Sequence, residues 1–133
     1  MAQYKTFETY VSDENNKILK QNDVSKVHHI TSSLDRDTLI KNNNVVVIDN
    51  YTDWCGPCRD CAPKFSHLAD QLSFTGLCAF GKENAEDDLG GLPIQINGVP
   101  SFHFYVNGVF QSEMTVSGAD IDAVEKILIN LLR

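Results

Sequence analysis

The sequence predicts an α/β domain in which a mixed central β-sheet is flanked by helices on both faces. The stretch "VVVIDNY" (45–51) opens with a β-branched run that is typical of a strand buried on both faces. Two stretches, 55–72 and 121–131, repeat apolar residues at helical spacing. The Asn-Gly dipeptide at 107–108 suits the two-residue turn of a β-hairpin. Helical connections imply parallel strands and a hairpin adds antiparallel ones, so we expect a mixed sheet.

The domain is predicted to begin with a short strand and a helix. The strand is "KVHHI" (26–30), and the helix lies in the following "SSLDRDTLIK". Ser32 or Ser33 is the expected N-cap, because a serine side chain can accept a hydrogen bond from an amide of the first turn. The acidic first turn favours a helix as well. Leu39 and Ile40 are its contribution to the core.

A longer helix follows the buried strand. Its apolar side is formed by Cys61, Phe65, Leu68, Ala69 and Leu72. Pro63 lies inside this pattern and cannot donate a backbone hydrogen bond, so we expect a kink there rather than an end. A second inner strand is expected at "LCAFGK" (77–82), in which Cys78 is a small buried residue.

The last third of the chain is predicted to contain the hairpin and a final helix. The hairpin occupies "SFHFYVNGVFQSEMTV" (101–116), after an irregular segment at 84–99. The helix begins near Ser117 or Asp120. Its apolar stripe consists of Ile121, Val124, Ile127, Leu128 and Leu131. Three histidines are expected to be ordinary surface residues of strands: His28, His29 and His103.

The composition indicates one folded domain with an acidic surface. The chain has 133 residues, of which 42% are hydrophobic, enough for a single core. We expect this domain at 25–133 and an N-terminal extension of uncertain structure at 1–24. The net charge of −7 argues against nucleic-acid binding, which needs clustered Lys and Arg. No membrane-length apolar run and no signal-peptide pattern is present, so we expect a cytoplasmic monomer that binds no membrane.

The stretch "DWCGPCRDCAP" (53–63) holds three of the four cysteines. Cys55 follows an inner strand and opens a helix, where the helix dipole and unpaired amide hydrogens lower the pKa of a thiol. Cys58 lies one turn on, close enough to form a disulfide. Gly56 allows the turn, and Pro57 loses no needed hydrogen bond in a first helical turn. We therefore expect Cys55 to be the exposed attacking sulfur and Cys58 the deeper, resolving one.

A metal site is the alternative to redox chemistry. The Cys-x-x-Cys-x-x-Cys pattern opens some iron–sulfur ligand runs, and two close cysteines are half of a zinc site. The fourth ligand is missing, however, because Cys78 is distant and His67 stands alone on a helix. No metal is therefore expected. Cys61 is either a buried structural residue or an auxiliary thiol that captures Cys58 under oxidation.

Three separated motifs resemble those of the thioredoxin family, over roughly residues 25–133. The first is "WCGPC" (54–58) followed by Pro63, and the second is "GVP" at 98–100. The third is the Asn-Gly turn followed by Gly118. The resemblance implies a thioredoxin-like fold, a redox-active dithiol and no cofactor.

A carboxyl group also stands inside the buried strand. Asp49 interrupts an apolar run, and a buried carboxylate has a raised pKa and can accept a proton near neutrality. The family resemblance implies that Asp49 deprotonates the resolving Cys58. It also aligns Lys82 with the lysine that pairs with this aspartate, although the register leaves Lys82 open to being an ordinary surface residue.

The resemblance further implies a groove for partner proteins beside the cysteines. Pro100 would follow a cis peptide bond and present the backbone of Val99 to an extended substrate. The expected substrate-binding residues are Trp54, Gly56, Pro57, Val99, Pro100 and Gly118. The chain departs from the family at Asn50-Tyr51, where an aromatic pair is usual, and in the segment at 84–98.

Three functions remain open from the sequence. The leading one is a thiol–disulfide oxidoreductase that reduces disulfides in partner proteins and is recharged by an upstream reductase. The second is a protein disulfide oxidase or isomerase, which the Gly-Pro spacer disfavours. The third is a binding subunit without essential redox chemistry, for which the N-terminal extension is the only support.

Overall fold

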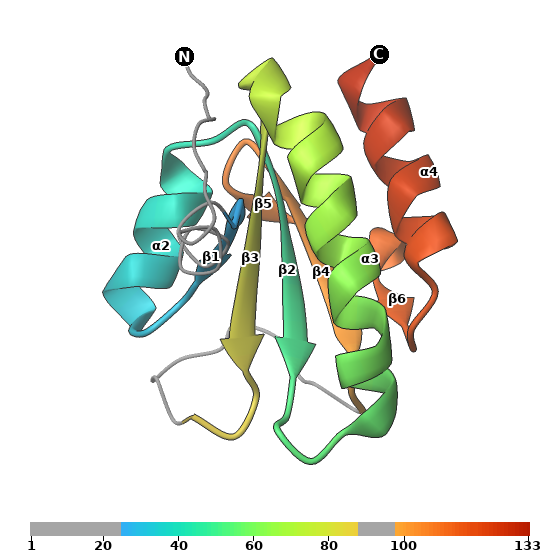
Figure 1. Cartoon of the computed structure of the whole chain (residues 1–133). Coiled ribbons are helices and arrows are strands. Elements are labelled where there is room, and N and C mark those ends of the chain that lie inside the picture. The colour runs from blue at the N-terminus through green and yellow to red at the C-terminus, as the bar shows by residue number, and fades with distance from the viewer. Residues whose placement is uncertain (1–24, 88–97) are drawn as a thin grey trace, which may run out of the picture.

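The structure is a computed structural model of the chain, and it describes residues 25–87 and 98–133. The predicted extension at 1–24 lies outside the described residues, as does most of the segment that was expected to be irregular. The described residues form a central sheet with helices packed against it (Figure 1).

The sheet is mixed, as predicted. Its strands are β1 (Val27–His29), β2 (Val45–Tyr51), β3 (Cys78–Asn84), β4 (Ser101–Val106), β5 (Val109–Phe110) and β6 (Val116–Ser117). The strand order is β1-β3-β2-β4-β5, and β6 also pairs with β4. The strands β1, β3 and β2 run parallel, and the later three pair antiparallel. The continuous apolar start of β2 reflects this central position, because β2 has a neighbour on each side and helices above and below.

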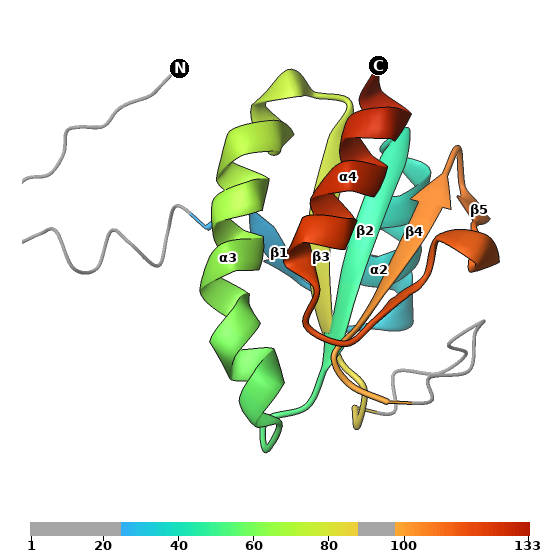
Figure 2. The same cartoon turned by 90° about the vertical axis from the view of Figure 1, so that its right-hand side faces the viewer.

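Helices cover both faces of the sheet, which confirms the predicted fold class (Figure 2). They are α2 (Ser33–Lys41), α3 (Gly56–Leu72) and α4 (Ile121–Leu132), with single 3-10 turns at Ser73–Thr75 and Ser112–Met114. The larger core lies between the sheet and α3 with α4, around Phe65, Phe80 and Phe102. The smaller core lies on the α2 face, around Ile30 and Ile48. None of the described helices is long and apolar enough to cross a membrane.

The local signals at the helix ends act as expected. Ser32, rather than Ser33, caps α2 by accepting a hydrogen bond from the amide of Asp35 at 3.0 Å. Asp120 caps α4 through the amide of Ala123 at 3.1 Å. The helix α3 continues through Pro63 and does not end there.

The predicted hairpin is only partly correct. Its Asn-Gly turn forms, and Asn107 has a positive φ of 51°. The returning strand is interrupted, however, because Phe102 pairs with Val116 while Tyr105 pairs with Phe110. Between these two pairs, β4 advances by three residues and the returning chain by six. The 3-10 turn at Ser112–Met114 accommodates the extra residues. The interruption places Met114 against the larger core, whereas the polar residues before it face solvent.

His103 is the one histidine whose predicted position is wrong. His28 and His29 are exposed on β1, as expected. His103 is only 2% exposed, because β4 lies beside the central strand and the ring packs against Phe110 with centroids 5.9 Å apart.

Candidate active site

The cysteine pair lies where β2 ends and α3 begins. Cys55 is the N-cap of α3, with an extended backbone of φ −86° and ψ 111°. Cys58 is the third residue of the helix, and the two residues are joined by a disulfide with their Cα atoms 5.2 Å apart. The prediction that these two cysteines approach within one turn is therefore supported by the geometry.

The helix supplies a hydrogen bond to the first sulfur. The amide of Cys58 donates to Cys55 Sγ at 3.1 Å, so this sulfur occupies the place that a serine oxygen takes in an ordinary N-cap. After reduction, the same amide and the positive end of α3 favour the thiolate form of Cys55. Cys55 is thus the sulfur with a physical reason to be the nucleophile.

The expected difference in exposure between the two sulfurs is wrong for the disulfide form. Cys55 and Cys58 are each 4% exposed. The segment before β4 covers Cys55, whose Sγ lies 3.7 Å from the carbonyl oxygen of Val99. Electrostatics, rather than depth, distinguishes the two cysteines in this state.

Asp49 is buried beside the second cysteine. It is 4% exposed, and its Oδ1 has no hydrogen-bond partner among the described residues. Burial raises the pKa of Asp49 from 3.8 to about 7, against a smaller lowering by the charge of Lys82. Asp49 and Cys58 line the same cavity, of about 190 Å³. A group that can accept a proton at neutral pH therefore shares a cavity with the second thiol.

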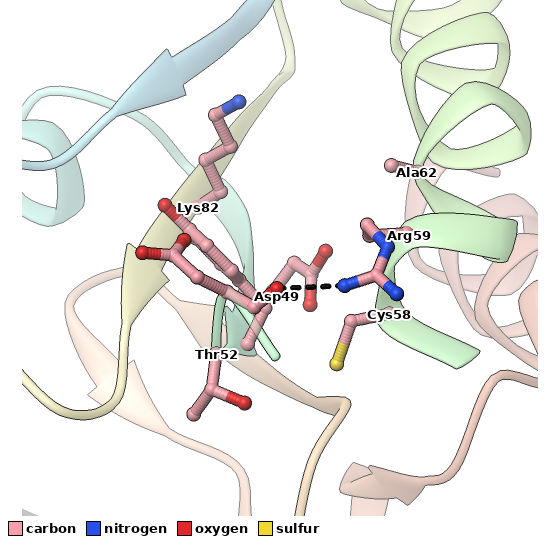
Figure 3. Close-up of a pocket in the computed structure, with 8 residues that line it drawn as sticks. Asp49, Thr52, Cys58, Arg59, Ala62 and Lys82 are labelled. Atoms are coloured by element: carbon pink, nitrogen blue, oxygen red, sulfur yellow. Dashed lines mark hydrogen bonds between the residues drawn. The ribbon is translucent and has the colours of Figure 1, made fainter. Parts of the chain in front are cut away.

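Lys82 lies in register with this aspartate. β3 runs parallel to β2 and pairs Lys82 with Asp49. Figure 3 shows the two residues on the strand side of the cavity and Cys58, Arg59 and Ala62 on the helix side. The tertiary structure thus places Lys82 beside Asp49 in the sheet, and its alignment with the family's lysine and its role stay predictions.

The predicted partner-binding residues gather around the disulfide. The Val99–Pro100 bond is cis, as the resemblance implied. The amide of Gly118 donates to the carbonyl of Pro100 at 2.9 Å, and Gly118 has a φ of 98°, which disfavours other residues. Trp54 is 67% exposed beside Cys55. The structure brings these residues together at one end of the sheet, and their contact with partners stays a prediction.

Gly56 and Pro57 form the first turn of α3. A Cβ atom built on Gly56 meets nothing within 4 Å, and its backbone has no positive φ. The expected steric need for glycine is therefore absent, and the space around its Cα atom is open. Pro57 is exposed and occupies a helix position where no amide hydrogen is needed.

Two residues of the site were missed in the sequence. The indole nitrogen of Trp54 donates to Glu86 Oε2 at 2.8 Å, which fixes the exposed ring. Arg59 lines the cavity that holds Asp49 and donates through Nη1 to the carbonyl of Asp53 at 2.7 Å (Figure 3). Neither charge is unusual in its local sequence, so no signal pointed to them.

The other two cysteines are free and buried. Cys61 lies on the inward side of α3, where its Sγ is 3.5 Å from the carbonyl oxygen of Cys58. Burial is the main cause that raises the pKa of Cys61 to about 11, so this thiol is a poor nucleophile. Cys78 is buried in β3, as expected. Within the described ranges, no group of three or more His, Cys, Asp or Glu could hold a metal ion.

The sequence model of the thioredoxin family matches residues 26–130, which include the cysteine pair, the buried aspartate and the cis-proline segment. The chain belongs to the thioredoxin family. A thioredoxin-family chain with a disulfide-bonded Cys-x-x-Cys pair is a thiol–disulfide oxidoreductase.

Individual thioredoxins agree with this assignment. The chain is 38% identical to thioredoxin-3 of Dictyostelium discoideum over 97 residues, which cover 73% of this chain and 88% of that protein. It is 30% identical to a thioredoxin of Neurospora crassa over 102 residues, or 74% of this chain and 80% of the other. Among solved structures, the thioredoxin of Malassezia sympodialis superimposes with a TM-score of 0.70 at 27% identity. That match covers 80% of this chain and 90% of the other.

Proposed function

We propose that this thioredoxin-family protein reduces disulfides in partner proteins. The Gly-Pro spacer between the cysteines favours this direction. The observation that supports the exchange chemistry itself most directly is the hydrogen bond from the amide of Cys58 to Cys55 Sγ at 3.1 Å. It favours a thiolate at Cys55 in the reduced protein, and the thiolate is the form that attacks a disulfide. A partner disulfide is the corresponding substrate.

The reaction has two thiol–disulfide exchange steps. First, the Cys55 thiolate attacks one substrate sulfur, a mixed disulfide forms, and the other substrate sulfur leaves as a thiolate. Cys58 then transfers its proton to Asp49 and attacks Cys55 Sγ. The Cys55–Cys58 disulfide forms, and the second substrate sulfur leaves as a thiolate. Two electrons thereby pass from the dithiol to the substrate, whose thiolates take up protons from solvent.

The environment of Asp49 supports its part in the second step. With its pKa raised to about 7, a substantial fraction of this carboxyl group is ionised at neutral pH and can accept the Cys58 proton. The two residues line one cavity of about 190 Å³, which has room for water to carry the proton between them. The acceptor is therefore both suitably basic and connected to its donor.

The substrate would lie along the surface formed by Trp54, Val99 and Gly118. The ring of Trp54 is exposed and held by Glu86, which makes it a rigid apolar contact for a partner. The half-buried Val99 lies at the disulfide, where its backbone can pair with an extended peptide. An extended protein segment that carries a disulfide fits these contacts.

We further propose that the protein works as a cytoplasmic monomer and is recharged by an upstream reductase. A dithiol that gives up electrons needs a reducing compartment, where thiols such as Cys61 and Cys78 also stay reduced. The net charge of −7 disfavours self-association. Each turnover leaves the disulfide form, so a separate enzyme must return two electrons to it.

The reduction potential of the Cys55–Cys58 pair tests the direction of electron flow. The protein is equilibrated in graded glutathione buffers, its thiols are alkylated, and each cysteine is read by mass spectrometry. We expect only these two cysteines to titrate, at a potential below a cytosolic glutathione pool of about −220 to −260 mV. A potential at or above that of the pool would make the protein an oxidase or isomerase.

The same preparation separates chemistry from binding. A Cys58→Ser variant should trap a mixed disulfide between Cys55 and a protein disulfide such as insulin, whereas Cys55→Ser should trap none. If serine at both positions leaves biological activity intact, the protein is a binding subunit and its redox chemistry is incidental.

A further inference from the structure

Three polar side chains form a buried hydrogen-bonded chain on the α2 face of the sheet, opposite Asp49. His103 Nδ1 lies 2.7 Å from Asn50 Oδ1, and His103 Nε2 lies 3.1 Å from the Ser101 hydroxyl oxygen. Asn50 and His103 are 2% exposed and Ser101 is 5% exposed. A buried polar group without a hydrogen-bond partner destabilises a fold, so the two hydrogen bonds offset the cost of burying these three side chains.

The direction of both hydrogen bonds follows from their partners. The amide oxygen of Asn50 can only accept, so His103 carries its hydrogen on Nδ1. The other ring nitrogen is then an acceptor, and the hydroxyl of Ser101 donates to it. Burial lowers the pKa of His103 to about 4, so the ring is neutral and the chain is intact across the physiological pH range.

Both ends of this hydrogen-bonded group lie in strands, and one of them borders a loop. Asn50 lies in β2, which is paired along its length with β3 and β4. Ser101 is the first residue of β4, where it pairs with Asn50 and Ser117, and it directly follows Pro100. Residues 98–100 belong to no helix or strand, yet Val99 within them lies against Cys55. The three side chains therefore add a second link, beside the pairing of Ser101 and the hydrogen bond from Gly118 to Pro100, between the centre of the sheet and the segment at 98–100.

We propose that His103 is a positioning residue for partner recognition. It fixes the Ser101 side chain to that of Asn50, reinforces the backbone pairing of Ser101, and thereby helps to hold the Val99–Pro100 segment where an extended substrate can pair with Val99. The inference rests on the proposed function, because it assigns His103 to the substrate-binding side of that reaction. It also gives a physical reason for Asn50, which stands where the family usually has an aromatic residue.

The test compares a protein substrate with a small one. Pre-reduced protein is mixed with insulin or with 5,5′-dithiobis(2-nitrobenzoate), and the second-order rate constant is measured for each. For His103→Phe we expect the insulin rate constant to fall at least about five-fold and the small-disulfide rate constant to change less than two-fold. The small disulfide needs only the sulfur chemistry, whereas insulin also needs the pairing with Val99.

Two further variants separate positioning from stability. In His103→Phe, the amide oxygen of Asn50 loses its hydrogen-bond partner. Asn50→Leu/His103→Phe replaces that amide with an apolar side chain, so its melting temperature should be higher than that of either single variant. Its insulin rate constant should stay low. Tyr105→Phe is the matched control, because Tyr105 lies on the same face of β4, packs on the same Phe110 ring and is also buried. It should leave both rate constants unchanged.

Amide hydrogen exchange tests the proposal independently of activity. Gly118 donates its amide to Pro100, so its exchange should quicken about ten-fold in His103→Phe and stay unchanged in Tyr105→Phe. If the wild type does not reduce insulin, the proposed function fails while this measurement still reports on His103. Unchanged exchange, or a parallel loss of both rate constants, would overturn the inference.

Discussion

At the scale of one residue, the burial of Asp49 suits it to accept a proton but lowers the stability of the fold. The strand around it is apolar, and burial raises its pKa to about 7. In the unfolded chain an aspartate has a pKa of about 3.9. Between these two values the unfolded chain has lost its proton while the folded protein keeps it. Stability therefore falls as the pH rises from about 4 to about 7, and the loss is constant above that window.

Asp49→Asn should remove this pH-dependent loss. We expect its free energy of unfolding to exceed that of the wild type above pH 7 by up to about 4 kcal/mol, since each pKa unit corresponds to about 1.4 kcal/mol. The difference should shrink steadily as the pH falls toward 4. Urea titrations at several pH values measure it, with Asp60→Asn on the exposed side of α3 as the control. A difference that does not vary with pH would contradict the buried carboxyl.

The helix α2 illustrates the scale of the element. Its sequence contains two adjacent serines, and only Ser32 adopts the extended backbone of an N-cap. Asp35 in the first turn accepts from the amide and hydroxyl of Thr31 and from His28, and these hydrogen bonds lower the pKa of Asp35. The start of the helix is thus fixed by side chains on both sides of the cap.

Ser32→Ala should therefore lower the free energy of unfolding by about 1 kcal/mol, because the amide of Asp35 loses its acceptor. Ser33→Ala, one position inside the helix, is the control and should have a much smaller effect. Chemical denaturation of both variants compares the two positions. Equal losses would mean that the cap is not at Ser32.

At the scale of the whole molecule, a buried ion pair joins α2 to the sheet. Arg36 Nη1 donates to Glu83 Oε2 at 2.8 Å, and the two side chains are 2% and 0% exposed. Burial is the main cause that raises the pKa of the neighbouring Tyr105 to about 12. This pair lies on the face away from Asp49, so it holds the layers together without entering the redox site.

Glu83→Gln should destabilise the fold by about 3–5 kcal/mol, because it removes the negative charge from a buried ion pair. The double variant Arg36→Met/Glu83→Leu should regain most of that loss. Thermal and urea unfolding measure both, and the reactivity of Cys55 with a small disulfide should stay unchanged in whichever variants fold. A loss below about 1 kcal/mol in the single variant would show that solvent already reaches the pair.

Features set by near neighbours in the chain were readable from the sequence. The cysteine pair, the helix that holds it and the buried strand with Asp49 depend on spacing and apolar pattern over a few residues. The Asn-Gly turn is of the same kind. The returning strand was not, because the packing of Met114 on the core interrupts it.

Only the tertiary structure decided which distant residues meet at the site. Val99 reaches Cys55 across 44 positions, Glu86 reaches Trp54 across 32, and His103 reaches Asn50 across 53. Strand order and register create these contacts, and no local pattern encodes them. The chemistry of the two sulfurs was therefore determined by the sequence itself, because capping and dipole act within one helical turn. The surface that presents those sulfurs to a partner was decided by the fold, because its parts come from separate strands and loops.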